Sequence, residues 1–264
     1  MVMDRLMRML RNTFIFLIMG LCFFGCSAEE NHERQRVVVY AASSLTDVLT
    51  TLENRFETSH PEIDVAIAYA GSQALRLRIN QGAPADVFIS ANPEHMTGLL
   101  SKGRIRQTQV FAYNRLAVVV PKANPAGIQN PQDLVKAKRL VMGNEEVPIG
   151  KYTRQWLLKM DNVSDRSFSQ RVLKSVVSQE NNVRLLRAKV ELGEADAAIV
   201  YVTDALSSSY VEYLPIDLET NIRTEYQLGI VSNKNSNAAM DIWLRFLGSD
   251  EARGLMEEEG LELP

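Results

Sequence analysis

Cysteine and histidine are scarce in this chain, which has two cysteines and three histidines among 264 residues. Both cysteines, Cys22 and Cys26, lie near the N-terminus, so a folded part that begins near Val37 contains none. No disulfide or thiolate chemistry is therefore available to that part. The histidines are scattered, at His32, His60 and His95. This scatter argues against a metal centre, because metal sites need clustered ligands.

The chain also lacks an excess of basic residues. It contains 29 Lys and Arg against 32 Asp and Glu, and without residues 1–25 the counts are 26 and 31, a net charge of about −5. Nucleic-acid binding depends on cationic groups that neutralise phosphates, so a nucleic-acid partner is not expected. Any anion bound here must be held by hydrogen bonds and local dipoles.

No apolar run reaches the roughly 20 residues that a membrane-spanning helix needs. The longest run, residues 14–24, follows a segment with three arginines and precedes Gly25. This order of basic, apolar and small residues predicts a signal peptide over residues 1–25 and therefore export.

Cys26 directly follows the small residue Gly25, an arrangement that resembles a bacterial lipobox. We therefore expect Cys26 to be lipidated and residues 26–36, which are polar, to form a flexible tether. The lipobox usually has Leu where this chain has Phe23. Cleavage after Ala28 without lipidation is the alternative.

The remaining chain alternates between apolar strands and segments of helical spacing. The segments that predict strands are residues 37–41, 63–69, 86–90, 115–121, 139–142, 197–201 and 226–231. Helical spacing lies between them and continues over a terminal region, residues 238–260. Helices that recur between apolar strands predict an α/β fold with a mainly parallel sheet.

Four of the predicted helices begin beside small or hydroxylic residues, at Ser44, Ser72, Ile149 and Val183. Helix N-termini leave N–H groups without partners and attract anions, and in α/β folds they gather at the carboxyl ends of the strands. Ser44 and Asp47 also have the spacing of a capping box. The common alternative to a ligand role is that such a serine only caps its own helix.

Several segments together resemble the periplasmic molybdate-binding proteins of ABC importers, in order and spacing. They are residues 41–46 (AASSLT), 69–72 (YAGS), 81–91 (QGAPADVFISA), 114–121 (NRLAVVVP), 143–152 (GNEEVPIGKY), 180–184 (ENNVR) and 193–204 (GEADAAIVYVTD). The resemblance implies a clamp-like, two-lobed periplasmic-binding-protein fold of type II. Lobe I would comprise residues 37–112 and 226–264, and lobe II residues 113–225.

The resemblance also implies the ligand contacts. The hydroxyls of Ser44, Ser72 and Tyr201 and the main-chain N–H groups of Ile149 and Val183 would bind molybdate or tungstate. Ile149 departs from the family, which usually has Ala at that position. The same resemblance implies that the ligand is delivered to the membrane subunits of an importer. We expect a monomer without a cofactor, and residues 1–26 predict that it is exported and anchored through Cys26 in the periplasm or on the outer face of the cytoplasmic membrane.

Three alternatives remain open. A protein of the same fold could bind another oxyanion, such as sulfate, phosphate or a phosphonate. Tyr201 could simply be an aromatic residue packed between the lobes. An exported serine hydrolase is a remote alternative, because no histidine stands near the serines and the nucleophile motifs are missing. We therefore do not expect an enzyme.

Overall fold

The computed structural model describes residues 34–163, 166–232 and 238–264. The predicted signal peptide, Cys26 and the tether up to residue 33 lie outside the described residues. Within those residues, every helix is too short or too polar to cross a membrane.

One part of the structure is built on strand β1 (Gln35–Ala42), which pairs in parallel with β2 (Ile63–Ala70) and β3 (Val87–Ser90). Strand β9 (Arg223–Val231) pairs antiparallel with β3 and with the first part of β4 (Ile105–Pro121). We call these strands sheet A. Its helices are α2 (Thr46–Ser59), α3 (Ser72–Asn80), α4 (Pro93–Leu100), α9 (Ala238–Leu247) and α10 (Asp250–Glu258).

The second part, sheet B, is built on β5 (Leu140–Gly143), which pairs in parallel with β6 (Val176–Glu180) and β7 (Ala197–Tyr201). The last part of β4 pairs antiparallel with β7 and with β8 (Val211–Pro215). Its helices are the 3-10 helix η3 (Pro131–Lys136), α5 (Pro148–Val163), α6 (Phe168–Lys174), α7 (Val183–Glu191) and α8 (Val202–Leu206).

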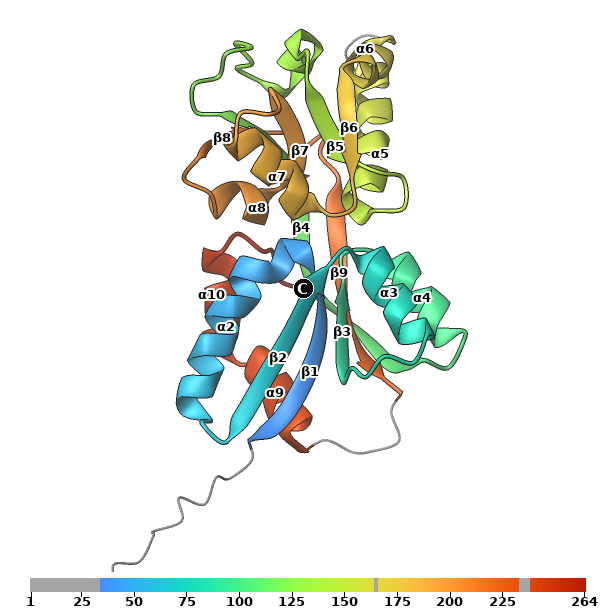
Figure 1. Ribbon diagram of the computed structural model, residues 1–264, viewed down its shortest axis with the longest axis vertical. Coiled ribbons are helices and arrows are strands. Elements are labelled where there is room, and N and C mark those ends of the chain that lie inside the picture. Colours follow the sequence, from blue (N-terminus) through green and yellow to red (C-terminus); the bar gives the residue numbers. More distant parts are fainter. Residues whose placement is uncertain (1–33, 164–165, 233–237) are drawn as a thin grey trace, which may run out of the picture. The chain divides into compact units, whose positions relative to one another are not determined.

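Strands β4 and β9 are the connection between the two sheets (Figure 1). β4 pairs with β9 up to Arg115 and with β7 from Leu116 onward. Most of the other strand pairs are parallel and have helices beside them, so the predicted α/β fold class is confirmed. The residue limits of the two lobes stay a prediction.

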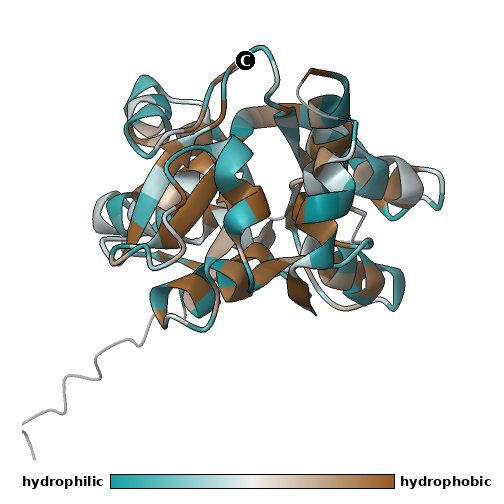
Figure 2. Ribbon diagram, turned by 90° about the horizontal axis from the view of Figure 1, so that it is seen from above, coloured by the Kyte–Doolittle hydropathy of each residue, from teal (hydrophilic) through white to brown (hydrophobic). Residues whose placement is uncertain are grey.

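Burial explains why these segments fold as they do. In α2 the apolar residues Val48, Leu49, Leu52 and Phe56 recur at helical spacing and are fully buried, so the helix presents one apolar face to the sheet. Apolar residues concentrate on the strands, whereas the surrounding helices carry both kinds (Figure 2). The same rule shapes the part around sheet B, where Trp156 of α5 is buried.

The structure differs from the sequence-based expectation in the length and number of some elements. β4 begins at Ile105, ten residues before the predicted strand, because polar exposed residues such as Gln107 interrupt the apolar signal. The terminal helical region is two helices, α9 and α10, with Gly248 and Ser249 between them. Ser249 caps α10 by accepting a hydrogen bond from the Ala252 N–H.

Candidate functional site

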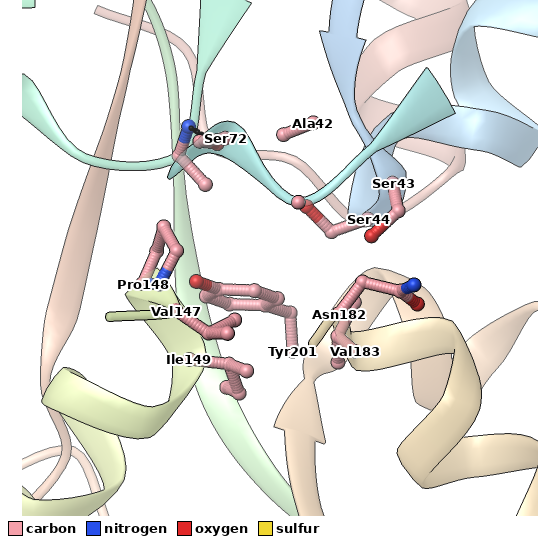
Figure 3. Close-up of a pocket in the computed structure, with 12 residues that line it drawn as sticks. Ala42, Ser43, Ser44, Ser72, Val147, Pro148, Ile149, Asn182, Val183 and Tyr201 are labelled. Carbon is pink, nitrogen blue, oxygen red and sulfur yellow. Dashed lines mark hydrogen bonds between the residues drawn. The ribbon is translucent and has the colours of Figure 1, made fainter. Parts of the chain in front are cut away.

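A small cavity lies between the helices of sheet A and those of sheet B. The 3-10 turn Ser43–Leu45 and the first turns of α3, α5 and α7 meet there. The space between the cavity walls, including the opening to solvent, is about 210 Å³. The residues that line it are Ala42, Ser43, Ser44, Gly71, Ser72, Ala91, Val147, Pro148, Ile149, Asn182, Val183 and Tyr201. All five residues predicted from the sequence to bind a ligand are among them, and Figure 3 shows the two serines facing Tyr201 across the cavity.

The lining of this cavity carries no formal charge. Among the residues that the structure describes, it contains no lysine, arginine, histidine, aspartate or glutamate, and its only titratable side chain is that of Tyr201. The polar groups that remain are hydroxyls, an amide and the N–H groups at the starts of helices, which carry partial positive charge. Such a lining can bind an anion through hydrogen-bond donors alone.

The side chain of Ser44 forms a hydrogen bond with a buried tyrosine, Tyr226. It lies in a buried 3-10 turn, Ser43–Leu45, and its Oγ is 2.8 Å from the hydroxyl oxygen of Tyr226. The predicted capping box is wrong, because the 3-10 turn makes Leu45 the N-cap of α2 and no side chain caps that helix. Asp47 forms an ion pair with Arg184 instead.

Ser72 is the first residue of α3, and its Oγ accepts a hydrogen bond from the Ala91 N–H at 3.2 Å. Because that oxygen already accepts, the Ser72 hydroxyl proton is free to donate into the cavity. The preceding Gly71 allows the two sides of the cavity to approach closely. A Cβ at this position would lie 2.4 Å from the carbonyl oxygen of Asn181.

Ile149 and Val183 lie in the first turns of α5 and α7. Their N–H groups have no partner within their own helices, since the first four N–H groups of a helix never do. The Asn182 side chain caps α7 by accepting from the Leu185 N–H at 3.1 Å. A hydrogen bond of 2.7 Å from Asn144 Nδ2 to Asn181 Oδ1 joins the two loops that precede these helices.

Tyr201 ends β7 and is 2% exposed. Among the described residues its hydroxyl has no hydrogen-bond partner. Burial raises the pKa of Tyr201 well above its usual value, and the nearby Tyr226 raises it further, so the hydroxyl stays protonated. A buried donor without a partner is costly, and a ligand in the cavity would supply the acceptor.

Sequence reasoning missed part of this site. Ser43, Ala91, Pro148 and Asn182 also line the cavity, and each lies within a segment that the sequence did single out, without having been named as a ligand contact. Tyr226 carried no such signal, because it lies on β9, far along the chain from Ser44.

The two described histidines, His60 and His95, lie away from this cavity. His60 stacks on Phe56 at the end of α2, and His95 lies within α4, where burial lowers its pKa to about 4. Neither histidine lines the cavity. No group of three metal-ligating side chains occurs among the residues that the structure describes.

Comparison with known proteins gives consistent matches over nearly all of the described chain. A model of the family "bacterial extracellular solute-binding protein" matches residues 37–262. The molybdate-binding protein ModA of Haemophilus influenzae is 30% identical over 253 residues, which cover 91% of this chain and 92% of that protein. A Bacillus subtilis protein named as an ABC transporter substrate-binding lipoprotein, YvgL, is 29% identical over 252 residues, 93% of either chain.

Solved structures with the same fold differ in the ligands that their names state. The periplasmic molybdate-binding protein of Azotobacter vinelandii has a TM-score of 0.74 at 19% identity, covering 86% of this chain and 99% of its own. The sulfate-binding protein SubI of Mycobacterium tuberculosis has a TM-score of 0.76 at 16% identity, covering 86% of each chain. At these identities the likeness concerns the fold alone and does not choose between anions.

Proposed function

This chain belongs to the bacterial extracellular solute-binding proteins, and from that premise we propose that it captures molybdate or tungstate for an ABC importer. The anion would occupy the cavity and accept hydrogen bonds from the hydroxyls of Ser44, Ser72 and Tyr201. The N–H groups of Ile149 and Val183 would supply two more. Hydrogen bonds to a charged acceptor contribute about 1.5–3 kcal/mol each, so several together can offset the loss of the anion's hydration.

The Tyr201 hydroxyl is the observation that carries this proposal. It is buried and protonated, and it has no partner among the described residues. Such a group implies that another molecule completes its hydrogen bonding. The absence of charged side chains around it favours a compact anion that accepts hydrogen bonds over its whole surface.

A second candidate is a same-fold protein that binds sulfate. The fold leaves it open, because the sulfate-binding protein SubI has the same fold and likeness at this identity does not choose between anions. The two candidates differ in ligand size, because molybdate and tungstate are close to each other in size and sulfate is smaller. Ile149 bears on this difference, since its side chain is buried beside the cavity, where the resembling proteins usually carry Ala.

The proposal extends to the setting in which the protein works. Residues 1–25 would be removed as a signal peptide, and Cys26 would then carry a lipid that anchors the protein on the outer face of the membrane. The relative named as a lipoprotein supports this anchor. Residues 37–112 with 226–264 and residues 113–225 would form two lobes of a monomer, and closure on the ligand would present both lobes to the importer.

Calorimetric titration with four anions tests the ligand. The protein without residues 1–26 is titrated with molybdate, tungstate, sulfate and hydrogen phosphate under identical conditions. We expect tight binding of the first two and at least about a hundredfold weaker binding of sulfate, equivalent to about 2.7 kcal/mol. Tight binding of sulfate or phosphate with none of molybdate would overturn the assignment.

A further inference from the structure

Tyr226 is a buried residue beside the candidate site that the proposed contacts leave unused. It lies on β9, is 0% exposed, and its hydroxyl oxygen is 2.8 Å from Ser44 Oγ. A hydrogen bond between two hydroxyls can run in either direction. The direction matters, because it decides whether Ser44 presents its proton or a lone pair to the cavity.

Two features decide this direction: the burial of Tyr226 and the amide of Asn114 on β4. The Asn114 Oδ1 accepts a hydrogen bond from the Arg115 N–H at 2.8 Å, which fixes the orientation of the amide. Its Nδ2 is therefore the group that faces the buried network, and an amide nitrogen can only donate. Burial raises the pKa of Tyr226 well above its usual value, so its hydroxyl keeps a proton that needs an acceptor.

The hydroxyl of Tyr226 is fully buried, and its hydrogen-bond partner at 2.8 Å is Ser44 Oγ. Asn114 Nδ2 can only donate, so Ser44 Oγ is the acceptor for the Tyr226 proton. Ser44 Oγ then accepts this hydrogen bond, and the proton of the Ser44 hydroxyl must point elsewhere. The cavity is the direction that remains, since Ser44 Oγ has no other hydrogen bond within the described residues.

A second branch from Asn114 reaches the main chain of Ser44. Asn114 Nδ2 donates to Thr203 Oγ1 at 2.9 Å, and Thr203 Oγ1 donates to the Ser44 carbonyl oxygen at 3.3 Å. One amide on β4, next to the point where that strand changes its partner, therefore supports the backbone of Ser44, while Tyr226 orients its side chain.

We propose that Asn114 and Tyr226 are positioning residues that make Ser44 an obligatory hydrogen-bond donor to the bound anion. This inference rests on the proposed function. The serine would otherwise turn freely, and a lone pair facing an anion is repulsive. The hydrogen bond from Tyr226 excludes the orientation with a lone pair toward the cavity before the ligand arrives, which lowers the cost of ordering the site on binding.

A double-mutant cycle on molybdate affinity tests the inference. The four proteins are the wild type, Ser44→Ala, Tyr226→Phe and the double variant. We expect Tyr226→Phe to weaken binding about tenfold in the wild type. The same change should weaken binding less than about twofold when Ser44 is already Ala, because no hydroxyl is then left to orient. Tyr40→Phe, a buried tyrosine on β1 that lines no part of the cavity, serves as the matched control and should leave the affinity unchanged.

A purely structural role for Tyr226 would give the same loss in both backgrounds, and that result would overturn the inference while leaving the proposed function intact. If the wild type does not bind molybdate, the proposed function fails and the inference with it. Should Tyr226→Phe fail to fold, Asn114→Asp replaces it in the cycle. A carboxylate at that position can only accept, so the chain of hydrogen bonds reverses, and the loss should again be larger with Ser44 present than with Ala.

Discussion

Arg184 of α7 forms an ion pair with Asp47 of α2, so a helix of sheet B is tied to a helix of sheet A beside the cavity. A second ion pair, between Lys151 and Glu94, joins α5 to α4. The Gln73 side chain adds a hydrogen bond of 2.8 Å to the Asn181 carbonyl oxygen. These contacts link the two sides of the cavity only while the sides are close together.

Removing the Asp47–Arg184 pair should therefore weaken ligand binding slightly. Both side chains are about one-third exposed, at 37% and 31%, so solvent screens the pair and its contribution is small. We expect Asp47→Asn to raise the Kd for molybdate by about two- to fivefold, with a smaller effect at high salt. Calorimetry at two salt concentrations measures both quantities.

Exchanging the two charges, with Asp47→Arg and Arg184→Asp in one protein, should recover part of the lost affinity, because Arg187 also pairs with Asp47 at 3.6 Å and would repel an arginine there. Lys136→Gln is the matched control, since its ion pair with Asp133 lies within η3 and joins no second element. An effect of that control equal to the effect of Asp47→Asn would mean that general charge, and not the link across the cavity, changes the affinity.

Tyr201→Phe should separate stability from binding. The hydroxyl is buried without a partner in the described structure, so its removal costs the empty protein nothing and relieves an unsatisfied donor. We expect an unchanged or higher melting temperature without ligand and a loss of affinity of about 1–3 kcal/mol. Thermal unfolding measures the melting temperature, and titration of the same sample measures the affinity. Tyr213→Phe on β8 is the control. A variant that melts early but binds normally would contradict a ligand role for this hydroxyl.

Ser72→Ala should lower both quantities, because this hydroxyl serves the fold as well as the cavity. Its loss leaves the buried Ala91 N–H without an acceptor, which costs about 1–3 kcal/mol of stability. The matched control is Ser90→Ala. Ser90 is fully buried and makes two hydrogen bonds to the Asn92 backbone, yet it does not line the cavity. The control should lose stability and keep its affinity, and equal losses of affinity in the two variants would remove Ser72 from the site.

Asp204 should make the protein less stable as the pH rises. Burial raises the pKa of this carboxyl to about 8, against the lowering effect of Arg187 and Arg184. The folded state therefore binds more protons than the unfolded state between the ordinary value of 3.8 and about 8. In that window the free energy of unfolding falls with rising pH, by at most about 1.4 kcal/mol per pH unit for one group.

Asp204→Asn removes the titrating group and should flatten this slope, so that the variant gains on the wild type as the pH rises from 5 to 8. Denaturant unfolding at several pH values measures the effect. Asp196→Asn is an informative comparison, since hydrogen bonds from Arg139 and the backbone outweigh burial and lower the pKa of Asp196. That variant should be less stable than the wild type at neutral pH, and the difference in stability between the two proteins should shrink in acid. If the free energy of unfolding changed with pH by the same slope in the wild type and in Asp204→Asn, the proposal that Asp204 is neutral when buried would be contradicted.

The sequence predicts the strands that are apolar runs better than those with several exposed positions. β1, β3 and β7 are continuous apolar runs, and their pattern alone locates them. β6 alternates between half-buried and exposed residues, and β8 has only two buried positions, so neither stands out from a loop. The first half of β4 is missed for the same reason, because its order comes from pairing with β9.

The site could be located from the sequence because its residues lie at predictable places, where strands end and helices begin. Ser72 and Val183 are found by this rule, and both lie in the first turn of a helix. The rule fails for the support behind these residues. The Ser44–Tyr226 hydrogen bond joins residues 182 positions apart, and no local pattern predicts it.

The uncharged lining of the cavity has a consequence for life outside the cytoplasm, where a cell does not control the acidity of its surroundings. A site built on lysine or histidine loses or gains charge as the medium changes. Here the only titratable group in the lining is a tyrosine whose pKa lies well above its usual value. The lining itself would therefore keep the same charge in mildly acidic and mildly alkaline habitats.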